Sequence, residues 1–426
     1  MNYTRKHQIN YLIGFLLLSA GLFAISSCSN SGAIKADQQR NLYDWEAKLI
    51  HPELMVYHQS ADSSTLYFKL FSDELLYTRS GPEDPFSAKM KFFLEVKDLK
   101  TGSIDSLEFN YYDINPEQES RQIIGKHRFK LNDLSYYDFR IKISDLSRKT
   151  SIIERLRVEK SPGLIRENML IIDDETLAPS FGNYSGVGRS LLMSSDRYQP
   201  EKLSISESKS DLPLPPPPYS YSEPKLDLGL EQEEALSSIG ELYLLSLDSS
   251  INVIRSADGL SSFALFGRPQ PYPEVRELDQ LIQSMRYITS RSEFKKITSS
   301  SYPKKALDEF WIETAGTKEK ARSLIRTYYR RVREANIYFS GITEGWKSDR
   351  GLVHIVFGNP NKIIVESDKE IWVYGEDSNI SALTFTFRKK THPYSHNLYV
   401  LDRSALYKPG WDQAVANWRR GRVFSE

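Results

Sequence analysis

Apolar and polar residues alternate in short runs between residues 43 and about 160, and turn-forming residues separate the runs. A period of two places successive side chains on opposite faces of an extended chain, so the pattern predicts β-strands, about seven in all. Six of them follow the runs 65–71, 89–96, 106–112, 126–131, 136–143 and 150–158.

These runs are rich in aromatic and β-branched residues, and turns recur at a spacing of about ten residues without any long helical period. Residues 43–163 are therefore expected to form an antiparallel β-sandwich that resembles immunoglobulin-like or fibronectin-like modules. Such modules usually position or bind other molecules, and the fold alone does not say which.

Residues 164–275 show further strand-like runs and are expected to form a second, smaller β domain. The stretches Glu241–Ser246 and Ile251–Ile254 flank Asp248, Ser249 and Ser250, which predicts a β-hairpin. A further strand is expected at Ser262–Phe266.

A proline-rich segment interrupts this second region, where Pro215, Pro216, Pro217 and Pro218 precede Tyr219. Consecutive prolines fix φ and favour an extended polyproline II conformation. The segment is either a docking ligand for an aromatic groove or a stiff connection between strands. We favour the connection, because strand-like runs lie on both sides of it.

Helical periodicity begins after Pro273, and residues 276–426 are expected to form an α+β domain with a small antiparallel sheet. Ser292 is a candidate N-cap for one helix, and Pro303 marks the start of another. Gly316 and Thr317 separate that helix from a long amphipathic helix over 318–339.

A dense turn, "ITEGWKSDRGLVHIVFGNP", follows the long helix. Gly341 is expected to cap the helix in the left-handed conformation, and Gly345 to let the backbone approach its neighbours. Trp346 should fold back as an apolar anchor whose indole N–H needs one partner, while Ser348 and Asp349 bond nearby amides.

The apolar run after this turn, Leu352–Phe357, is expected to be a strand opened by Gly351 and closed by a turn at Gly358–Pro360. An antiparallel meander then follows over 369–374, 382–388 and 398–401. The spacing of Trp411, Ala414, Val415 and Trp418 predicts a short covering helix.

The N-terminus has a different pattern, in which Arg5 and Lys6 precede an apolar run that ends just before Cys28. The run 11–25 is shorter than the roughly 20 residues that a membrane-spanning helix needs, so residues 1–27 are expected to be a signal peptide. Small residues leading to Cys28 resemble a bacterial lipobox, with Cys28 as the lipidated residue. Residues 28–42 would form the polar tether.

Composition indicates a globular protein, with 40% hydrophobic and 26% charged residues among 426, enough for two or three domains. Without residues 1–27 the 56 basic residues fall to 54 against 56 acidic ones, a net charge of −2. No basic field for nucleic acid is therefore expected. Since Cys28 is the only cysteine, disulfides and cysteine-ligated metal sites are excluded in the mature chain.

Candidate catalytic chemistry is sparse. Ser348, Asp349 and His354 are the residue types of a nucleophile triad, but Ser348 and Asp349 are adjacent and His354 is expected on a strand, so nothing orients them together. His392 and His396 are the nearest histidine pair, and Pro393 between them argues against a helical metal site. We expect no catalytic residue, no metal and no cofactor.

Trp346, Trp372 and Tyr374 could stack on a sugar ring. Core positions are the favoured interpretation, because these residues fall inside regular periodic segments.

Five motifs occur in one order: Phe310–Trp311, the arginine-rich helix, the stretch 345–351, the stretch 357–360 and the stretch 370–374. Together they resemble the GWxTD domain of envelope proteins from Bacteroidota and related phyla, over residues 276–426. Ser348 stands where Thr is usual, which keeps the hydroxyl. The resemblance implies an envelope lipoprotein, and its motif residues are Gly345, Trp346, Ser348, Asp349, Arg350, Gly351, Gly358, Pro360, Trp372 and Tyr374.

These observations lead us to expect an outer-membrane lipoprotein, facing the periplasm and held to lipid through Cys28. Its expected work is that of a non-catalytic scaffold or recognition subunit in an envelope assembly or protein-export complex, with other envelope proteins as partners. The alternative is a glycan- or peptidoglycan-binding protein. Nucleic acid is not an expected partner.

Overall fold

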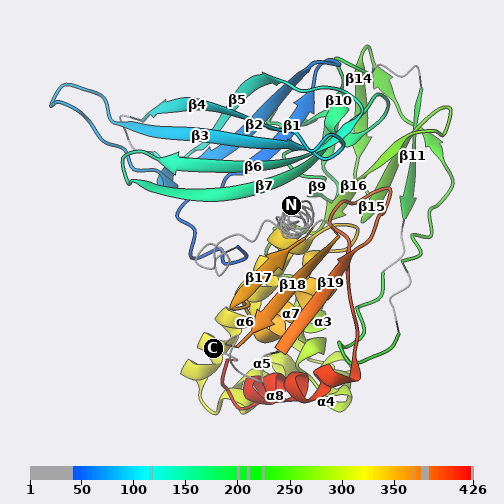
Figure 1. Cartoon of the computed structure of the whole chain (residues 1–426). Coiled ribbons are helices and arrows are strands. Elements are labelled where there is room, and N and C mark those ends of the chain that lie inside the picture. Colours follow the sequence, from blue (N-terminus) through cyan, green and yellow to red (C-terminus); the bar gives the residue numbers. More distant parts are fainter. Residues whose placement is uncertain are drawn as a thin grey trace, which may run out of the picture.

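The computed structural model describes residues 42–115, 117, 119–198, 202–208, 212–222, 226–366, 368–375 and 383–423. The expected signal peptide, Cys28 and the tether up to residue 41 lie outside these residues. The fold class is as predicted, because antiparallel sheets form the N-terminal part and helices with a small antiparallel sheet form the C-terminal part (Figure 1).

The first region is a sandwich of two antiparallel sheets, and each of the six predicted runs lies within or overlaps one of its strands. Alternation explains the core: every second residue of β3, from Ala88 to Val96, is buried between the sheets. One sheet has the order β1 (Glu53–His58), β2 (Ser63–Phe71), β5 (Gln122–Lys130), and the other β4 (Ile104–Ile114), β3 (Ser87–Asp98), β6 (Ser135–Asp145), β7 (Thr150–Lys160).

The second β region also contains two sheets. One has the order β13 (Ser238–Ile239), β14 (Leu242–Ser246), β10 (Ser190–Ser194), β8 (Leu170–Asp173). The other has the order β12 (Glu234–Ala235), β11 (Leu203–Ser208), β15 (Ile251–Ser256), β16 (Ser262–Arg268), β9 (Tyr184–Gly186), with β9 parallel to β16.

The predicted hairpin between β14 and β15 is wrong, because the two strands belong to different sheets. The turn between the two strands takes the chain from one sheet to the other, and Leu247 in this turn is fully buried. Gly267 of β16 makes room for this turn, since a Cβ there would lie 2.4 Å from the carbonyl oxygen of Ser249. The true hairpin joins β15 to β16.

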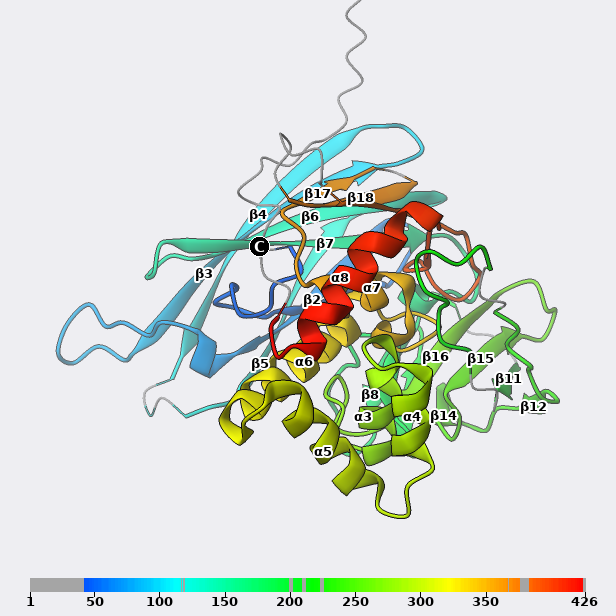
Figure 2. The same cartoon turned by 90° about the horizontal axis from the view of Figure 1, so that it is seen from below.

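The C-terminal part packs helices and a four-stranded meander around one large core (Figure 2). The helix predicted over 318–339 and the covering helix are confirmed. The helices are α3 (Leu278–Ser284), α4 (Arg291–Thr298), α5 (Pro303–Ala315), α6 (Lys318–Phe339), α7 (Asp349–Phe357) and α8 (Lys408–Arg419). The strands are β17 (Lys362–Val365), β18 (Lys369–Tyr374), β19 (Leu383–Lys389) and β20 (Tyr399–Leu401).

The expected strand Leu352–Phe357 is instead the body of helix α7, which begins at Asp349. Every residue of this helix is buried. A short helix that is buried on all sides can be apolar around most of its circumference. Its sequence then shows no helical period, so the run Leu352–Phe357 could not be distinguished from a buried strand by its pattern.

Two predicted caps are also corrected. Ser290, and not Ser292, caps α4, and its side chain forms a capping box with Glu293. Gly341 does not adopt the left-handed conformation, because α6 ends through the extended residue Ser340. Gly316, with a φ of 79°, and Thr317 separate α5 from α6 as predicted.

The N-terminal end of the described chain is fixed to the C-terminal part. Tyr43 is buried among the rings of Tyr338, Phe339 and Trp372. Glu46 forms an ion pair with Arg330 of α6 at 3.0 Å. In the part of the chain that the structure covers, no helix is both long and apolar enough to cross a membrane.

Candidate functional site at the glycine-tryptophan corner

We call residues 345–351 the GW corner, where the chain turns from α6 into α7 through a short 3-10 helix, η4 (Gly345–Lys347). Two glycines set its geometry. A Cβ on Gly345 would lie 1.8 Å from the carbonyl oxygen of Ala335, and a Cβ on Gly351 would lie 2.0 Å from that of Gly345. The backbones of α6, η4 and α7 therefore touch at contacts that only glycine permits.

Trp346 is 1% exposed and anchors the corner to the core, as predicted. Its backbone N–H donates to Oδ1 of Asn336 at 3.2 Å, and its carbonyl accepts from the hydroxyl of Tyr287 at 2.7 Å. The buried indole N–H, which was expected to need a partner, forms no hydrogen bond with any of the described residues. The Lys347 ammonium lies 5.1 Å from the ring centroid.

Ser348 is the N-cap of α7. Its hydroxyl accepts from the backbone N–H of Gly351 at 3.0 Å and donates to the carbonyl of Gly345 at 2.7 Å. The hydroxyl that Ser shares with Thr therefore carries out the predicted turn bonding.

Asp349 acts over a longer range than predicted. Its buried carboxylate pairs with the guanidinium of Arg403 and accepts from the backbone N–H of Leu401 at 2.8 Å. Because α7 begins at Asp349, the carboxylate also lies in the first turn, where the helix dipole favours a negative charge. This residue fastens α7 to the end of β20.

Arg350 forms a second buried pair, with Glu370 of β18 at 3.0 Å. The same carboxylate accepts from the hydroxyl of Tyr43 at 3.0 Å and from the indole N–H of Trp372 at 3.1 Å. Burial, followed by the negative charge of Glu370, raises the pKa of Tyr43 well above its usual value, so the hydroxyl stays a donor.

Sequence reasoning missed Glu370, Tyr43 and Arg403. A usable pattern existed for Glu370, because it shares the period-two face of β18 with Trp372 and Tyr374. A carboxylate on a buried face requires a cation or donors, and that requirement points to a partner.

The remaining motif residues are also buried and in contact with one another. Gly358 ends α7 with a φ of 84° against the guanidinium of Arg331, and its carbonyl accepts from the hydroxyl of Tyr374 at 2.8 Å. Pro360 is buried in the following turn, and Trp372 is 0% exposed.

The candidate triad is not assembled. His354 is 0% exposed on α7, and its Nε2 lies 3.0 Å from the carboxylate of Glu334. Ser348 bonds backbone groups and Asp349 pairs with Arg403, so the three residues have separate partners. His354 was expected on a strand, and its placement on α7 corrects that prediction.

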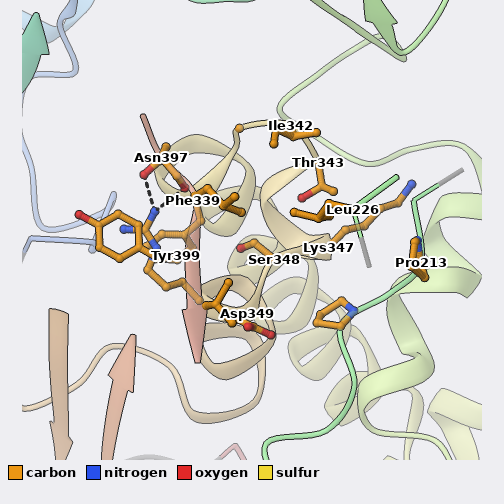
Figure 3. A pocket seen from close by; sticks show the side chains of 15 residues that line it. Pro213, Leu226, Phe339, Ile342, Thr343, Lys347, Ser348, Asp349, Asn397 and Tyr399 are labelled. Atoms are coloured by element: carbon orange, nitrogen blue, oxygen red, sulfur yellow. Dashed lines mark hydrogen bonds between the residues drawn. The ribbon is translucent and has the colours of Figure 1, made fainter. Parts of the chain in front are cut away.

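The space beside the corner is small. A pocket of about 40 Å³ separates Ser348 and Asp349 from Pro213 and Leu226 (Figure 3). A volume of this size holds about one water molecule, which is too little for a sugar or peptide.

The proline-rich segment crosses this same face. Pro215 and Pro218 are buried. The carbonyl of Pro216 accepts from the Arg403 guanidinium at 3.1 Å, and that of Pro218 accepts from the backbone N–H of Ser404 at 3.1 Å. Tyr219 lies under the Lys408 ammonium at 4.9 Å, while Pro217 is exposed.

His392 and His396 lie in the loop between β19 and β20, where His392 contacts Tyr394 and His396 contacts Tyr136. Among the residues that the structure describes, no group of three or more His, Cys, Asp or Glu side chains is placed to hold a metal ion.

Comparison with known proteins gives one family. Residues 251–420 match the family model of the GWxTD domain, a span that begins at β15 and ends just after α8. No curated protein matches the sequence.

Solved structures offer only weak likenesses. A calcium-binding mutant of Bacteroides uniformis beta-glucuronidase 2 aligns at 12% identity and a TM-score of 0.19, over 38% of this chain and 16% of the glucuronidase chain. The C-terminal 282-residue fragment of intimin, in complex with the intimin-binding domain of the translocated intimin receptor, aligns at 7% identity and a TM-score of 0.14. That alignment covers 84% of this chain and 95% of the fragment.

Proposed function

Because the chain contains a GWxTD domain, we propose that it is a periplasm-facing outer-membrane lipoprotein that works as a non-catalytic scaffold or recognition subunit of an envelope assembly or protein-export complex. The observation that carries the proposal is that the polar side chains of the GW corner and of α7 already have partners within the domain. Ser348, Asp349, Arg350 and His354 are each bonded to other groups of the same domain.

Those bonds support a structural role. A catalytic group must reach a substrate, whereas the charged pairs of Arg350 with Glu370 and of Asp349 with Arg403 are almost completely buried. Breaking a buried pair leaves an uncompensated charge, so each pair fixes the arrangement of the elements that it joins. The corner therefore holds α6, α7 and the meander together, and partner binding falls to other surfaces.

Anchoring is the second part of the proposal. Acylated Cys28 would hold the protein to lipid, and the folded body begins where Tyr43 enters the core. The residues between them could reach at most about 50 Å when fully extended. Such a reach would keep the C-terminal domain close to the membrane surface.

The glycan-binding alternative has less support. Trp346, Trp372 and Tyr374 are only 1%, 0% and 4% exposed, so their faces are covered by protein. A sugar needs an exposed ring to stack on, and these three residues do not provide one.

Co-purification from native membranes tests the proposal. We expect the full-length protein to incorporate labelled fatty acid, to be extracted by mild detergent together with partner envelope proteins, and to lose both properties in a Cys28→Ser variant. Extraction as a single protein that is retained on a peptidoglycan or polysaccharide column would contradict it.

Trp346→Ala offers a second test on purified protein. Removing a fully buried indole should destabilise the C-terminal domain by about 3–5 kcal/mol. Loss of a binding activity with unchanged stability would instead indicate a ligand platform.

A further inference from the structure

The connection between β11 and β12 is far longer than the sheet requires. Ser208 and Leu230 face each other as a bridge pair at the end of these neighbouring antiparallel strands. Two to five residues usually close such a connection. Here an excursion of 21 residues, 209–229, separates the two bridge partners along the chain.

The excursion reaches the C-terminal part (Figure 1). We call its described residues 212–219 the strap. The strap contacts Arg403, Ser404 and Lys408, which lie between β20 and the start of α8. Long connections without regular structure are uncommon in compact domains, and ordered ones are usually functional. The start of this strap, at Leu212, still packs against β15 and β16 of its own sheet, whereas residues 216–219 lie on the C-terminal part.

The hydrogen bonds to the strap are made with its backbone carbonyls and not with polar side chains. The Arg403 guanidinium donates to the carbonyl of Pro216, and the backbone N–H of Ser404 donates to that of Pro218. The carbonyl of Pro217 accepts from the backbone N–H of Ser220 at 2.9 Å and closes a turn, which leaves the carbonyls of Pro216 and Pro218 for these two donors. The Lys408 ammonium covers the Tyr219 ring that ends the strap.

A groove of about 710 Å³ continues beside the strap. It is lined by Leu214 and Tyr219 of the strap, by Phe294 of α4, and by Trp411 and Val415 of α8. This volume lies in the range of ligand sites, and aromatic-lined grooves are the usual receptors for proline-rich segments. The groove therefore has room for more chain than the strap supplies.

We propose that this surface of the GWxTD domain, formed by α4, α8 and residues 403–408, is a binding site for an extended, proline-rich segment of a partner protein, and that the chain's own strap fills part of it. The inference rests on the proposed recognition function and names the chemistry of the partner. The strap is the observation that selects this ligand, because the surface already holds one segment of that kind.

The tethered strap must also weaken binding from outside. A covalently attached ligand is present at an effective concentration of the order of millimolar, so a free peptide of equal affinity competes poorly. A partner segment gains an advantage by also filling the groove beside Phe294 and Val415.

A peptide-binding assay on the purified full chain tests this. The probe is a fluorescein-labelled peptide with the sequence of residues 212–222, and its anisotropy is followed against wild type and a strap variant that combines Pro215→Gly, Pro216→Gly, Pro217→Gly, Pro218→Gly and Tyr219→Ala. We expect the strap variant to bind at least tenfold more tightly than wild type. Should the combined variant fail to fold, Tyr219→Ala alone provides the same comparison.

Two controls identify the groove and the ligand chemistry. Val415→Glu in the strap variant should weaken binding at least tenfold, whereas Gln413→Glu, which adds the same charge at an exposed position outside the groove on the same helix, should not. A peptide with alanine in place of every proline should bind at least fivefold more weakly.

Equal binding by wild type and the strap variant would overturn the inference, as would absence of binding to the folded strap variant. Because the assay uses purified protein without lipid, either failure would leave the co-purification test of the proposed function unaffected.

Discussion

The N-terminal sandwich and the C-terminal domain bury their polar groups in different ways. The sandwich core consists almost wholly of alternating aliphatic and aromatic side chains, with Phe68, Phe92 and Phe139 at its centre. Its ion pairs, such as Asp138 with Arg157, are partly exposed. The C-terminal core instead encloses charged pairs beneath large aromatic rings.

This difference determines how well each core tolerates substitutions. An apolar core accepts changes that conserve volume, because dispersion and burial have no direction. A buried charged pair depends on direction and distance, and it penalises any change that leaves one partner alone. We therefore expect matched substitutions to cost more in the C-terminal domain. All six tryptophans lie in this domain or, for Trp45, against its helix α6, so tryptophan fluorescence reports its unfolding.

The largest expected contrast is between two glycines. Gly345→Ala places a methyl group against the backbone of α6, so we expect the C-terminal domain to lose about 5 kcal/mol or more, or not to fold. Urea unfolding measures the loss, followed by tryptophan fluorescence for Gly345→Ala and by circular dichroism for the control in the sandwich. Gly102→Ala in the turn between β3 and β4, where φ is 76° and nothing lies near, should cost only about 1–2 kcal/mol. Equal costs at both positions would remove the contrast.

Glu370→Gln should cost the C-terminal domain about 3–5 kcal/mol. The amide leaves the Arg350 guanidinium without its counter-charge and brings an N–H₂ group toward the donors of Tyr43 and Trp372. The matched change in the sandwich is Asp138→Asn, whose carboxylate is 44% exposed, and it should cost less than about 1 kcal/mol. Native-state hydrogen exchange can measure both. A small loss for Glu370→Gln would show that the pair contributes little.

The sandwich also buries a few polar groups, and one of them, His58, gives a pH dependence. Burial, the largest cause, lowers the pKa of His58 to about 4. Its Nε2 lies 2.9 Å from the carbonyl of Glu159 and its Nδ1 2.8 Å from Oγ of Ser64, an arrangement that suits a neutral ring.

Because the unfolded ring takes up a proton near pH 6.5 and the folded ring only near pH 4, stability is lost as the pH falls through this window. The sandwich should lose roughly 2–3 kcal/mol between pH 7 and pH 4 through this group. Urea unfolding at several pH values, followed by circular dichroism, should show a shallower fall in a His58→Gln variant. Parallel curves for the two proteins would refute the assignment.

The smallest expected effect concerns the cap of α7. Ser348→Ala removes the bonds to Gly351 and Gly345 and should cost about 1–2 kcal/mol, whereas Ser348→Thr keeps the hydroxyl and should cost less than about 0.5 kcal/mol. Thermal unfolding monitored by fluorescence can compare the two variants. A larger loss for Thr than for Ala would mean that the hydroxyl is not what the position requires.

Much of the fold was contained in local patterns. The six runs of the sandwich, the helix 318–339 and the close approach at Gly345 could all be predicted, since alternation, helical spacing and the small size of glycine act over a few residues. The importance of the corner could likewise be predicted from its dense set of turn-forming residues. The pairing of its buried polar groups could not, because Glu370, Tyr43 and Arg403 are distant in sequence from the corner.

By itself, then, the sequence determined which segments with alternating polarity are extended, which amphipathic segments are helical, and where most of the turns lie. Tertiary structure decided three further points: that Leu352–Phe357 is a helix, that the turn after β14 crosses between sheets, and that the strap contacts residues 403–408 near α8. The physical reason is the same in each case. A segment that is buried on every side, or whose partner lies far along the chain, takes its conformation from contacts that its own residues do not encode.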